Sequence, residues 1–452
     1  MHNDKAIYDA RSLGMGRMCL LGMQHTFAMF GATVLVPILT GLNVATTLLM
    51  AGVGTLLFHL VTKGKVPAFL GSSFAFLGGY AAVAPLIDGK PNEAMLPYAS
   101  GGVFLAGLVY VAMAIVIKTF GFKKIMKFFP PVVTGPIIIA IGLILAPTAI
   151  KNCQTNWIVA LSAMVTIVVF TIWGRGMMRI IPIILGVIVS YVVAIFIHQV
   201  DFSGVAQQSY IGLPPIQMMK FDLSAAVTIM PIALATMMEH IGDITAIGAT
   251  TGKNFISDPG LHRTMLGDGL ATSVSAAFGG PANTTYGENT GVLALTKIYD
   301  PKVVEIAAVF AILLSFIPKL SYLISTVPAA TIGGVSLILY GMISAIGIRN
   351  IVENQVDFTK SRNTIIAALI LVCALGFNAT GGITFSVFST EINLSGIAIA
   401  AFVGIFANII LPGNDYIFSE EREEEFEIEA LSDYIGTEVE DRLKHSEENI
   451  DQ

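Results

Sequence analysis

Long apolar runs follow one another along almost the whole chain, separated by short breaks that are polar or marked by Gly and Pro. Each run has about 17–25 residues, enough for one helix to cross a hydrocarbon layer about 30 Å thick. Because that layer offers no water, the backbone must bond to itself, and long apolar runs do so as helices. With 54% hydrophobic and 12% charged residues, the sequence predicts an all-α polytopic membrane protein and excludes a soluble core.

About fourteen runs qualify as membrane spans. The expected spans are 18–40, 44–62, 67–86, 98–118, 131–150, 156–174, 180–198, 225–248, 264–280, 282–297, 303–318, 327–346, 363–378 and 394–412. Lys and Arg gather in alternate loops, and basic loops favour the cytoplasmic side. An even number of crossings fits this pattern, so a multi-pass protein of the cell membrane with both termini in the cytoplasm is expected.

The two ends of the chain and its cysteines indicate no further chemistry. The first residues lack the short apolar segment of a removable signal peptide, so the first helix is expected to act as the insertion signal. From Glu420 onward fourteen acids stand against three basic residues, which predicts a solvated cytoplasmic tail. Cys19, Cys153 and Cys373 are scattered and odd in number, without a disulfide or metal-ligand spacing. No metal and no cofactor is expected.

Carboxylates interrupt two of the apolar runs. Glu288 and Asn289 lie within Pro281–Lys297, and Glu239 and Asp243 lie within an earlier run. An ionisable group at bilayer depth costs about 2.5–3.5 kcal/mol even on lenient insertion scales, so such groups normally face a cavity or a substrate path. No Lys or Arg stands directly beside these acids. The pattern favours a proton-linked site for a polar solute.

Three features recur in the two halves of the chain, about 200–215 residues apart. The matching pairs are Gln24-His25 with Glu239-His240, Phe74 with Tyr286, and Pro131 with Pro328. Transporters are often built from inverted repeats, with the substrate site between them near the membrane midplane. Fourteen crossings then divide into two repeats of seven, and an odd number of crossings in each makes the repeats inverted. Chance similarity is the alternative.

Two equivalent segments, GSSFAF at 71–76 and PANTTYGEN at 281–289, are rich in Ser, Thr, Gly and Asn and poor in Leu. Neither is expected to begin as regular helix. Extended backbone at membrane depth needs partners for its N–H and C=O groups, so the two segments are expected to pair. Their helical continuations would then direct partially positive N-termini at the centre, which predicts a polar pocket near the midplane.

The stretch ENTGVLALTK, Glu288 to Lys297, fits a signature of an acid or amide, Asn, any residue, Gly, four variable residues, Thr and a basic residue. The chain thereby resembles the nucleobase–ascorbate transporter family from about Gln24 to Pro412. Other matching stretches are QHTFAMFGATVLVP, GSSFAF, DPGLHRTMLGDGL, NTTYGENTGV, GGVSLILYGMI and IGIRNIVENQVDF. At position 288 the chain has glutamate rather than glutamine, and in this it resembles the bacterial uracil permease branch of the family. Asp243 departs from that branch, which has histidine there, and this puts the proton-carrying detail in doubt.

The resemblance implies two inverted seven-helix repeats, with short extended segments in helices 3 and 10, divided into a core domain and a gate domain. The implied segments are an N-terminus at 1–17, core halves at 18–126 and 223–318, gate halves at 127–202 and 325–412, and an acidic tail at 413–452. Helices 1–4 and 8–11 would form the core domain, and helices 5–7 and 12–14 the gate domain. A homodimer is implied as well.

The resemblance also implies proton-coupled uracil symport by alternating access. The implied uracil-binding residues are Glu239 and Glu288 through their side chains, Phe74 and Gly287 through their main chain, and Tyr286 and Tyr340 along the pocket. Glu239, Asp243 or Glu288 would carry the proton, and Asn289 and His25 would support the motif. A flat ring with two N–H donors and two carbonyl acceptors is complementary to carboxylates and backbone amides.

Other readings of these residues stay open. The buried acids could serve as structural hydrogen-bonding groups, His25 and His240 could pack helices, and the aromatic residues could be ordinary core. A purine or xanthine carrier of the same family is the main functional alternative, followed by an anion transporter of the same architecture. An enzyme is the least favoured class, because the sequence shows no two-histidine zinc motif, glycine-rich nucleotide loop or soluble catalytic domain. No nucleic-acid partner is expected.

Overall fold

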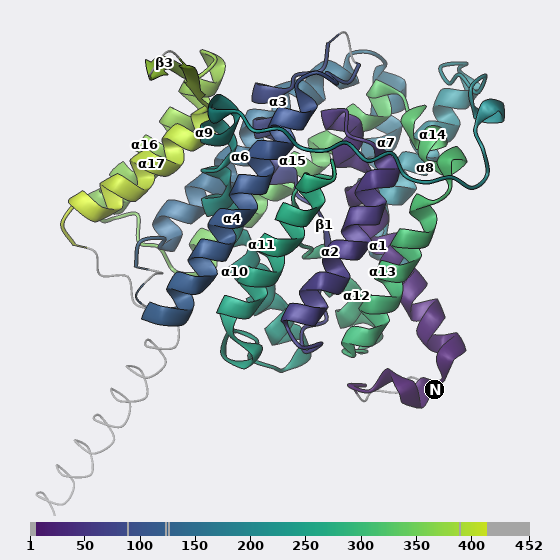
Figure 1. Cartoon of the computed structure of the whole chain (residues 1–452), viewed down its shortest axis with the longest axis horizontal. Coiled ribbons are helices and arrows are strands. Elements are labelled where there is room, and N and C mark those ends of the chain that lie inside the picture. Colours follow the sequence, from purple (N-terminus) through teal and green to yellow (C-terminus); the bar gives the residue numbers. More distant parts are fainter. Residues whose placement is uncertain (1–5, 88–89, 123, 125–126, 388–389, 414–452) are drawn as a thin grey trace, which may run out of the picture. The chain divides into compact units, whose positions relative to one another are not determined.

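The computed structural model describes residues 6–87, 90–122, 124, 127–387 and 390–413, with Met1–Asn408 forming one compact unit. Helices dominate this part of the chain (Figure 1). The helices of the first half are α1 (Met15–Thr40), α2 (Val44–Val61), α3 (Leu77–Val83), α4 (Leu96–Phe120), α6 (Pro131–Cys153), α7 (Trp157–Trp173) and α8 (Pro182–Phe196). Those of the second half are α9 (Leu223–Ile229), α10 (Ile232–Thr251), α11 (Leu261–Ala277), α12 (Glu288–Thr296), α13 (Pro301–Ser315), α14 (Pro318–Ser325), α15 (Ala329–Glu353), α16 (Ser361–Ala379) and α17 (Gly396–Ile410).

The helices are long and apolar enough to make this a multi-pass membrane protein. Within the described ranges, seven helices meet the length and composition needed to cross a membrane, and up to eight do if the bent pair α13 and α14 forms one span. Four shorter apolar helices, Phe74–Val83, Trp157–Trp173, Pro182–Phe196 and Gly396–Ile410, fall below that length. The fourteen-span inverted repeat, the side on which each terminus lies and the core and gate boundaries stay predictions.

Local sequence signals set several helix boundaries. Asn43 caps α2 by accepting the Thr46 N–H at 3.1 Å, and Asp300 caps α13 by accepting the Lys302 N–H at 3.0 Å. Such side chains satisfy N–H groups that the first helical turn leaves unpaired. At the other end, α1 stops at Gly41, whose φ of 83° lies in the left-handed region that glycine adopts without strain.

Two short strands cross inside the helical assembly and confirm the expected extended segments. Strand β1 (Leu70–Ser72) pairs antiparallel with β2 (Asn283–Thr285), in the register Leu70 with Thr285 and Ser72 with Asn283. Helix α3 follows β1 after a short 3-10 turn at Phe74–Phe76, and α12 follows β2 directly. The two polar segments therefore pair with each other, as their composition predicts, and each continues as a helix.

Side chains from neighbouring helices satisfy the outer edges of this two-stranded ribbon. Thr55 of α2 accepts the Leu70 N–H at 2.9 Å, and its hydroxyl oxygen lies 3.1 Å from the Leu70 carbonyl and 2.8 Å from the Ala51 carbonyl. Thr272 of α11 donates to the Asn283 carbonyl at 2.6 Å, and the Asn283 amide donates to the Met50 carbonyl at 2.7 Å. Because backbone away from water must find partners inside the protein, these hydroxyl and amide groups explain how strands persist at membrane depth.

Several predicted spans are broken or shortened. The expected span 225–248 consists of α9 and α10, separated at Met230–Pro231, and the span 282–297 consists of β2 and the short helix α12. Helices α13 and α14 are bent by 84°. Proline lacks the N–H that continues a helix, which accounts for the break before α10. A further hairpin, β3 (Ile383–Val387) with β4 (Thr390–Leu394), lies between α16 and α17 and has no counterpart among the expected elements.

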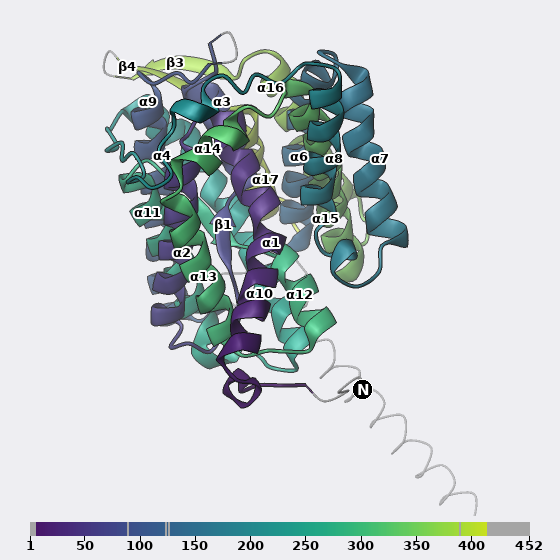
Figure 2. The same ribbon diagram turned by 90° about the vertical axis from the view of Figure 1, so that its right-hand side faces the viewer.

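The helices pack in two groups. Helices α1, α2, α4, α11 and α13 contact one another around the strands, while α6, α7, α8 and α15 pack together on the other side (Figure 2). Glycine permits a close approach in the second group, where a Cβ at Gly142 of α6 would lie 2.2 Å from the Tyr340 carbonyl oxygen of α15. Small residues at such crossings let membrane helices pack backbone against backbone.

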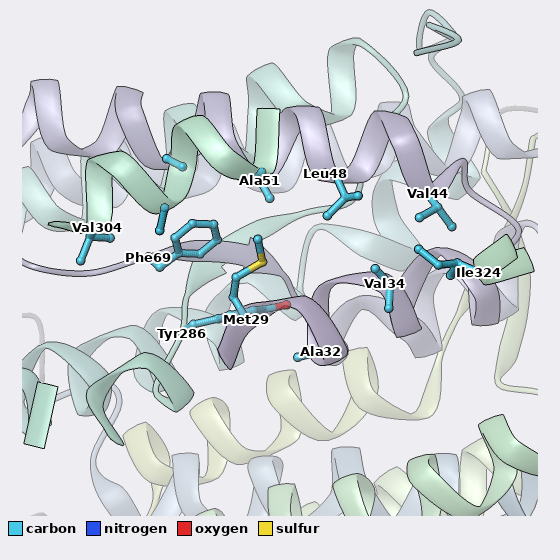
Figure 3. Packing of buried hydrophobic residues seen from close by; sticks show 13 residues of the cluster. Met29, Ala32, Val34, Val44, Leu48, Ala51, Phe69, Tyr286, Val304 and Ile324 are labelled. Atoms are coloured by element: carbon cyan, nitrogen blue, oxygen red, sulfur yellow. The ribbon is translucent and has the colours of Figure 1, made fainter. Parts of the chain in front are cut away.

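An apolar cluster encloses the strands in the first group (Figure 3). Its members come from α1, α2, α13, α14 and the two strand segments, and they include Met29, Leu48, Phe69, Tyr286 and Val304. We name it the strand cluster. It includes Tyr286, two residues before α12, and so it anchors the chain just before the motif helix.

Candidate functional site

The turn from β2 into α12 is the centre of the candidate site. Gly287 precedes the helix and Glu288 is its first residue. The Thr290 N–H donates to the Gly287 carbonyl at 3.0 Å, and the N–H groups before it have no carbonyl of the helix to bond to. A helix N-terminus carries about half a positive charge and favours carboxylate or carbonyl oxygens nearby. The side chain of Glu288, which the sequence places in the site, lies outside the described part of the structure.

Asp243 lies against this turn. A Cβ atom added to Gly287 would lie 2.9 Å from Oδ1 of Asp243, so the carboxylate occupies the space that glycine leaves open. Asp243 and Glu239 lie one turn apart on α10, and both side chains are half-buried. The structure therefore brings one predicted proton-coupling residue to the main chain of a predicted substrate-binding residue.

Tyr286 joins the two strands to α1. Its hydroxyl donates to the Ser72 carbonyl at 2.9 Å and lies 3.4 Å from Oγ1 of Thr33, and its N–H donates to the Phe69 carbonyl at 2.9 Å. The ring lies directly on Gly71, where a Cβ would come within 2.4 Å of it. The side chain is 4% exposed and belongs to the strand cluster. Its described contacts are with the protein core.

Asn289 and His25, which the sequence assigns to the support of the motif, are in contact. The Asn289 Nδ2 group lies 3.2 Å from Nδ1 of His25, and both side chains are buried. This pair connects the first turn of α12 to α1. The Ser72 hydroxyl of β1 donates to the Thr33 carbonyl of α1 at 3.0 Å. Helix α1 therefore contacts both β1 and α12.

Phe74 and Tyr340 come from opposite sides of the site. Phe74 is half-buried and packs against the strand cluster and also against a second cluster, formed by residues of α1, α7, α8 and α15. We name this the α15 cluster; its buried members are Leu35, Ala163, Ile167, Ile183, Ile332, Val335 and Leu339. Tyr340 follows Leu339 on α15 and is buried. Phe74 thus lies where the two helix groups meet, while the described contacts of Tyr340 are within α15 and with α6.

A buried network beside the turn was missed by sequence reasoning. Asp268 of α11 accepts the Thr285 N–H at 3.1 Å on Oδ2 and the Thr285 hydroxyl at 3.0 Å on Oδ1. His240 Nδ1 lies 2.8 Å from Asp268 Oδ2. The available signal was an acid inside the expected span 264–280, within the stretch DPGLHRTMLGDGL. Asp268 holds the last residue of β2.

The site thus combines a helix N-terminus, half-buried carboxylates and main-chain groups. It can offer acceptors to N–H groups of a ligand and donors to its carbonyl oxygens. Among the described residues, no group of three or more His, Cys, Asp or Glu side chains is arranged to hold a metal ion.

Comparison with known sequences finds relatives that are described as permeases. The family model described as the Permease family matches residues 16–383. The chain is 42% identical to the uracil permease of Bacillus caldolyticus over 414 residues, covering 88% of this chain and 93% of that protein. It is 38% identical to the uracil permease of Escherichia coli K12 over 401 residues, covering 86% of this chain and 90% of that protein.

Solved structures of low sequence identity share the fold. The murine anion transporter Slc26a9 in its inward-facing state aligns with a TM-score of 0.64 at 12% identity, covering 91% of this chain and 73% of that one. The transmembrane domain of the cyanobacterial bicarbonate transporter BicA aligns with a TM-score of 0.57 at 14% identity, covering 89% of this chain and 99% of that one. At such identities the likeness concerns the fold alone.

Proposed function

The chain belongs to the permease family of nucleobase–ascorbate transporters, and on that premise we propose that it carries uracil together with a proton across the cytoplasmic membrane by alternating access. The family makes it a permease rather than an enzyme. The observation that carries the proposal for the site is the contact of Asp243 with Gly287 at the start of α12, one turn from Glu239 on α10.

Uracil is neutral and flat, with two N–H donors and two carbonyl acceptors. We assign its N–H groups to the carboxylates of Glu239 and Glu288, and its carbonyl groups to main-chain N–H groups near Phe74 and Gly287. A site that satisfies such groups rejects rings without the matching edge, because its own buried polar groups would be left unpaired. Tyr286 and Tyr340 support the pocket walls in this proposal.

The proton is assigned to the acids near the start of α12. Asp243 approaches the space at Gly287, which supports placing this carboxylate and uracil in one region. A carboxylate deprived of water binds a proton more readily, so entry of uracil and a change of protonation are expected to be linked. Glu239, Asp243 and Glu288 are the candidates, and no cofactor besides the coupling proton is proposed.

Alternating access is assigned to relative motion of the two helix groups. Phe74 packs against both the strand cluster and the α15 cluster, which supports a substrate site at their junction. The proposal treats 18–126 and 223–318 as the moving core domain and 127–202 and 325–412 as the gate domain. It also includes a homodimer and cytoplasmic termini; the acidic tail at 413–452 falls almost entirely outside the described residues.

The test is uptake of radiolabelled uracil into proteoliposomes, with and without an inward proton gradient. Glu239→Gln, Asp243→Asn and Glu288→Gln are compared with Glu353→Gln, which changes an exposed acid on α15. We expect gradient-driven uptake in the native protein and in Glu353→Gln, and its loss in Glu239→Gln and Glu288→Gln. For Asp243→Asn we expect uptake that no longer responds to the gradient.

Competition separates the alternatives. Unlabelled xanthine is expected to leave uracil uptake unchanged, and bicarbonate and chloride likewise. Efficient competition by xanthine would favour a purine carrier over a uracil carrier. Absence of uracil uptake together with anion uptake would favour the function of the structural relatives, although carboxylates at the centre of the site are poorly suited to anions.

A further inference from the structure

Asp268 is a carboxylate without any exposed surface in the middle of α11. Its two oxygens face the N–H and the hydroxyl of Thr285 and the imidazole of His240. A charged group removed from water is tolerated when it is paired and hydrogen-bonded, and an uncompensated one is strongly disfavoured. Among the described basic side chains, only His240 lies within 4.0 Å of Asp268.

The surroundings of the His240 ring consist of hydrogen-bond acceptors. Nδ1 lies 2.8 Å from Oδ2 of Asp268, and the nearby Thr285 hydroxyl already donates to Oδ1 of Asp268. Nε2 lies 3.0 Å from Oγ1 of Thr264, and that hydroxyl donates to the Leu261 carbonyl at 3.0 Å. A hydroxyl has a single proton, so with that proton on the Leu261 carbonyl Thr264 is an acceptor for Nε2. Both ring nitrogens are therefore placed to donate.

We propose that His240 is held as an imidazolium, as the permanent counter-charge of Asp268, and that the pair positions β2 instead of carrying the transported proton. The net charge of the buried pair is then zero. Tyr110 of α4 lies within electrostatic range of Asp268 and also of Glu239 and Asp243, the two other ionisable groups on this part of α10. The effect on transport rests on the proposed function, whereas the protonation state of the ring does not.

The positioning role follows from what Asp268 binds. Thr285 is the last residue of β2, and both its N–H and its hydroxyl donate to this carboxylate. The next residues are Tyr286 and Gly287, from which α12 starts. If the ion pair is broken, Asp268 loses its counter-charge and the end of β2 loses its fixed partner. The main chain at Gly287 would then shift relative to Asp243.

The first test is spectroscopic and uses the full chain in lipid nanodiscs. Side-chain nitrogen NMR of ¹⁵N-histidine-labelled protein is recorded at pH 8, where free histidine is neutral. We expect one histidine with both ring nitrogens protonated, and we expect that signal to vanish in His240→Gln and to persist in the control His198→Gln, which changes an exposed histidine. A neutral tautomer at His240 would overturn the proposal, even if uracil uptake is intact.

The second test covers the case in which a single variant does not fold. His240→Gln and Asp268→Asn each leave one buried charge unpaired, whereas the double variant carries a neutral amide pair. We expect both single variants to melt at lower temperature than the double variant. Equal or additive losses would contradict an ion pair. In the double variant, the pH dependence of uracil uptake is expected to match that of the native protein, and a changed profile would show that His240 carries transported protons.

Discussion

The side-chain amide of Asn289 donates to Nδ1 of His25 at 3.2 Å. The two residues are 264 positions apart in the sequence, and their contact joins α12 to α1. Because the amide is the donor, Nδ1 acts as the acceptor and carries no proton. The pair fixes α12 against α1 at the turn where the helix starts. It also gives the Asn of the family motif a structural task.

Replacing Asn289 tests this contact. Asn289→Ala leaves the buried Nδ1 of His25 without its donor, at a cost of about 1–3 kcal/mol in the free energy of unfolding. Thermal unfolding in detergent measures the loss. Asn363→Ala serves as the control, because it removes an exposed hydrogen bond from the Asn363 side chain to the Asp357 carbonyl. Its free energy of unfolding is expected to stay within about 0.5 kcal/mol of that of the native protein. Equal stability of the two variants would contradict a stabilising role for the pair.

A methyl group at Gly287 is expected to impair transport. Gly287→Ala would bring Cβ to 2.9 Å from the Asp243 carboxylate, a separation that forces one of the two to move. We expect the KM for uracil to rise by about tenfold or more, equivalent to about 1.4 kcal/mol. Gly376→Ala on α16, outside the motif, has no atom within 4 Å of the added group and is expected to transport normally. Normal uptake by Gly287→Ala would argue against substrate contact at this turn.

Tyr286→Phe separates a core role from a substrate role. The change removes the hydroxyl that donates to the Ser72 carbonyl at 2.9 Å and keeps the ring. An unsatisfied buried carbonyl predicts a loss of about 1–3 kcal/mol in stability with little change in KM. Unfolding and uptake are measured on the same preparation, with Tyr299→Phe as the matched variant. A raised KM at unchanged stability would instead mean that the hydroxyl contacts uracil.

The crossing of α6 and α15 depends on Gly142. Gly142→Ala would place Cβ 2.2 Å from the Tyr340 carbonyl and 2.3 Å from the Ser344 hydroxyl oxygen, so the helices must separate. Overpacking of this kind costs about 1–3 kcal/mol. Gly341→Ala on α15, with no atom within 4 Å, is expected to melt like the native protein. Thermal unfolding of the two alanine variants decides the point, and equal melting temperatures would show that the interface accommodates the methyl group.

The composition of two segments predicted the paired strands at the centre of the fold. The Ser, Thr, Gly and Asn content around Ser72 and Asn283 predicts extended segments, and the pairing of β1 with β2 confirms them. The hairpin of β3 with β4 and the 84° bend between α13 and α14 were not foreseen. The length of an apolar run shows that a segment can span the membrane. A proline or a packing contact decides where the helix in that segment breaks or bends.

For the candidate site, the sequence identified acids and a motif but not all of their contacts. Asn289 and His25 were assigned to one supporting role and are found in contact. Asp268 was missed, because only the fold brings it to Thr285 and His240, 17 and 28 positions away in the chain. Tyr286 was expected along a pocket, and its described contacts bind the two strands together.

By itself, the sequence determined that this chain crosses a membrane as helices, because long apolar runs leave the backbone no other partner. It also determined the family, because the motif from Glu288 to Lys297 is a local pattern. Only the tertiary structure decided that Asp243 lies against Gly287 and that Asp268 pairs with His240. Such contacts join residues on different elements, and their geometry follows from how helices pack around the two strands.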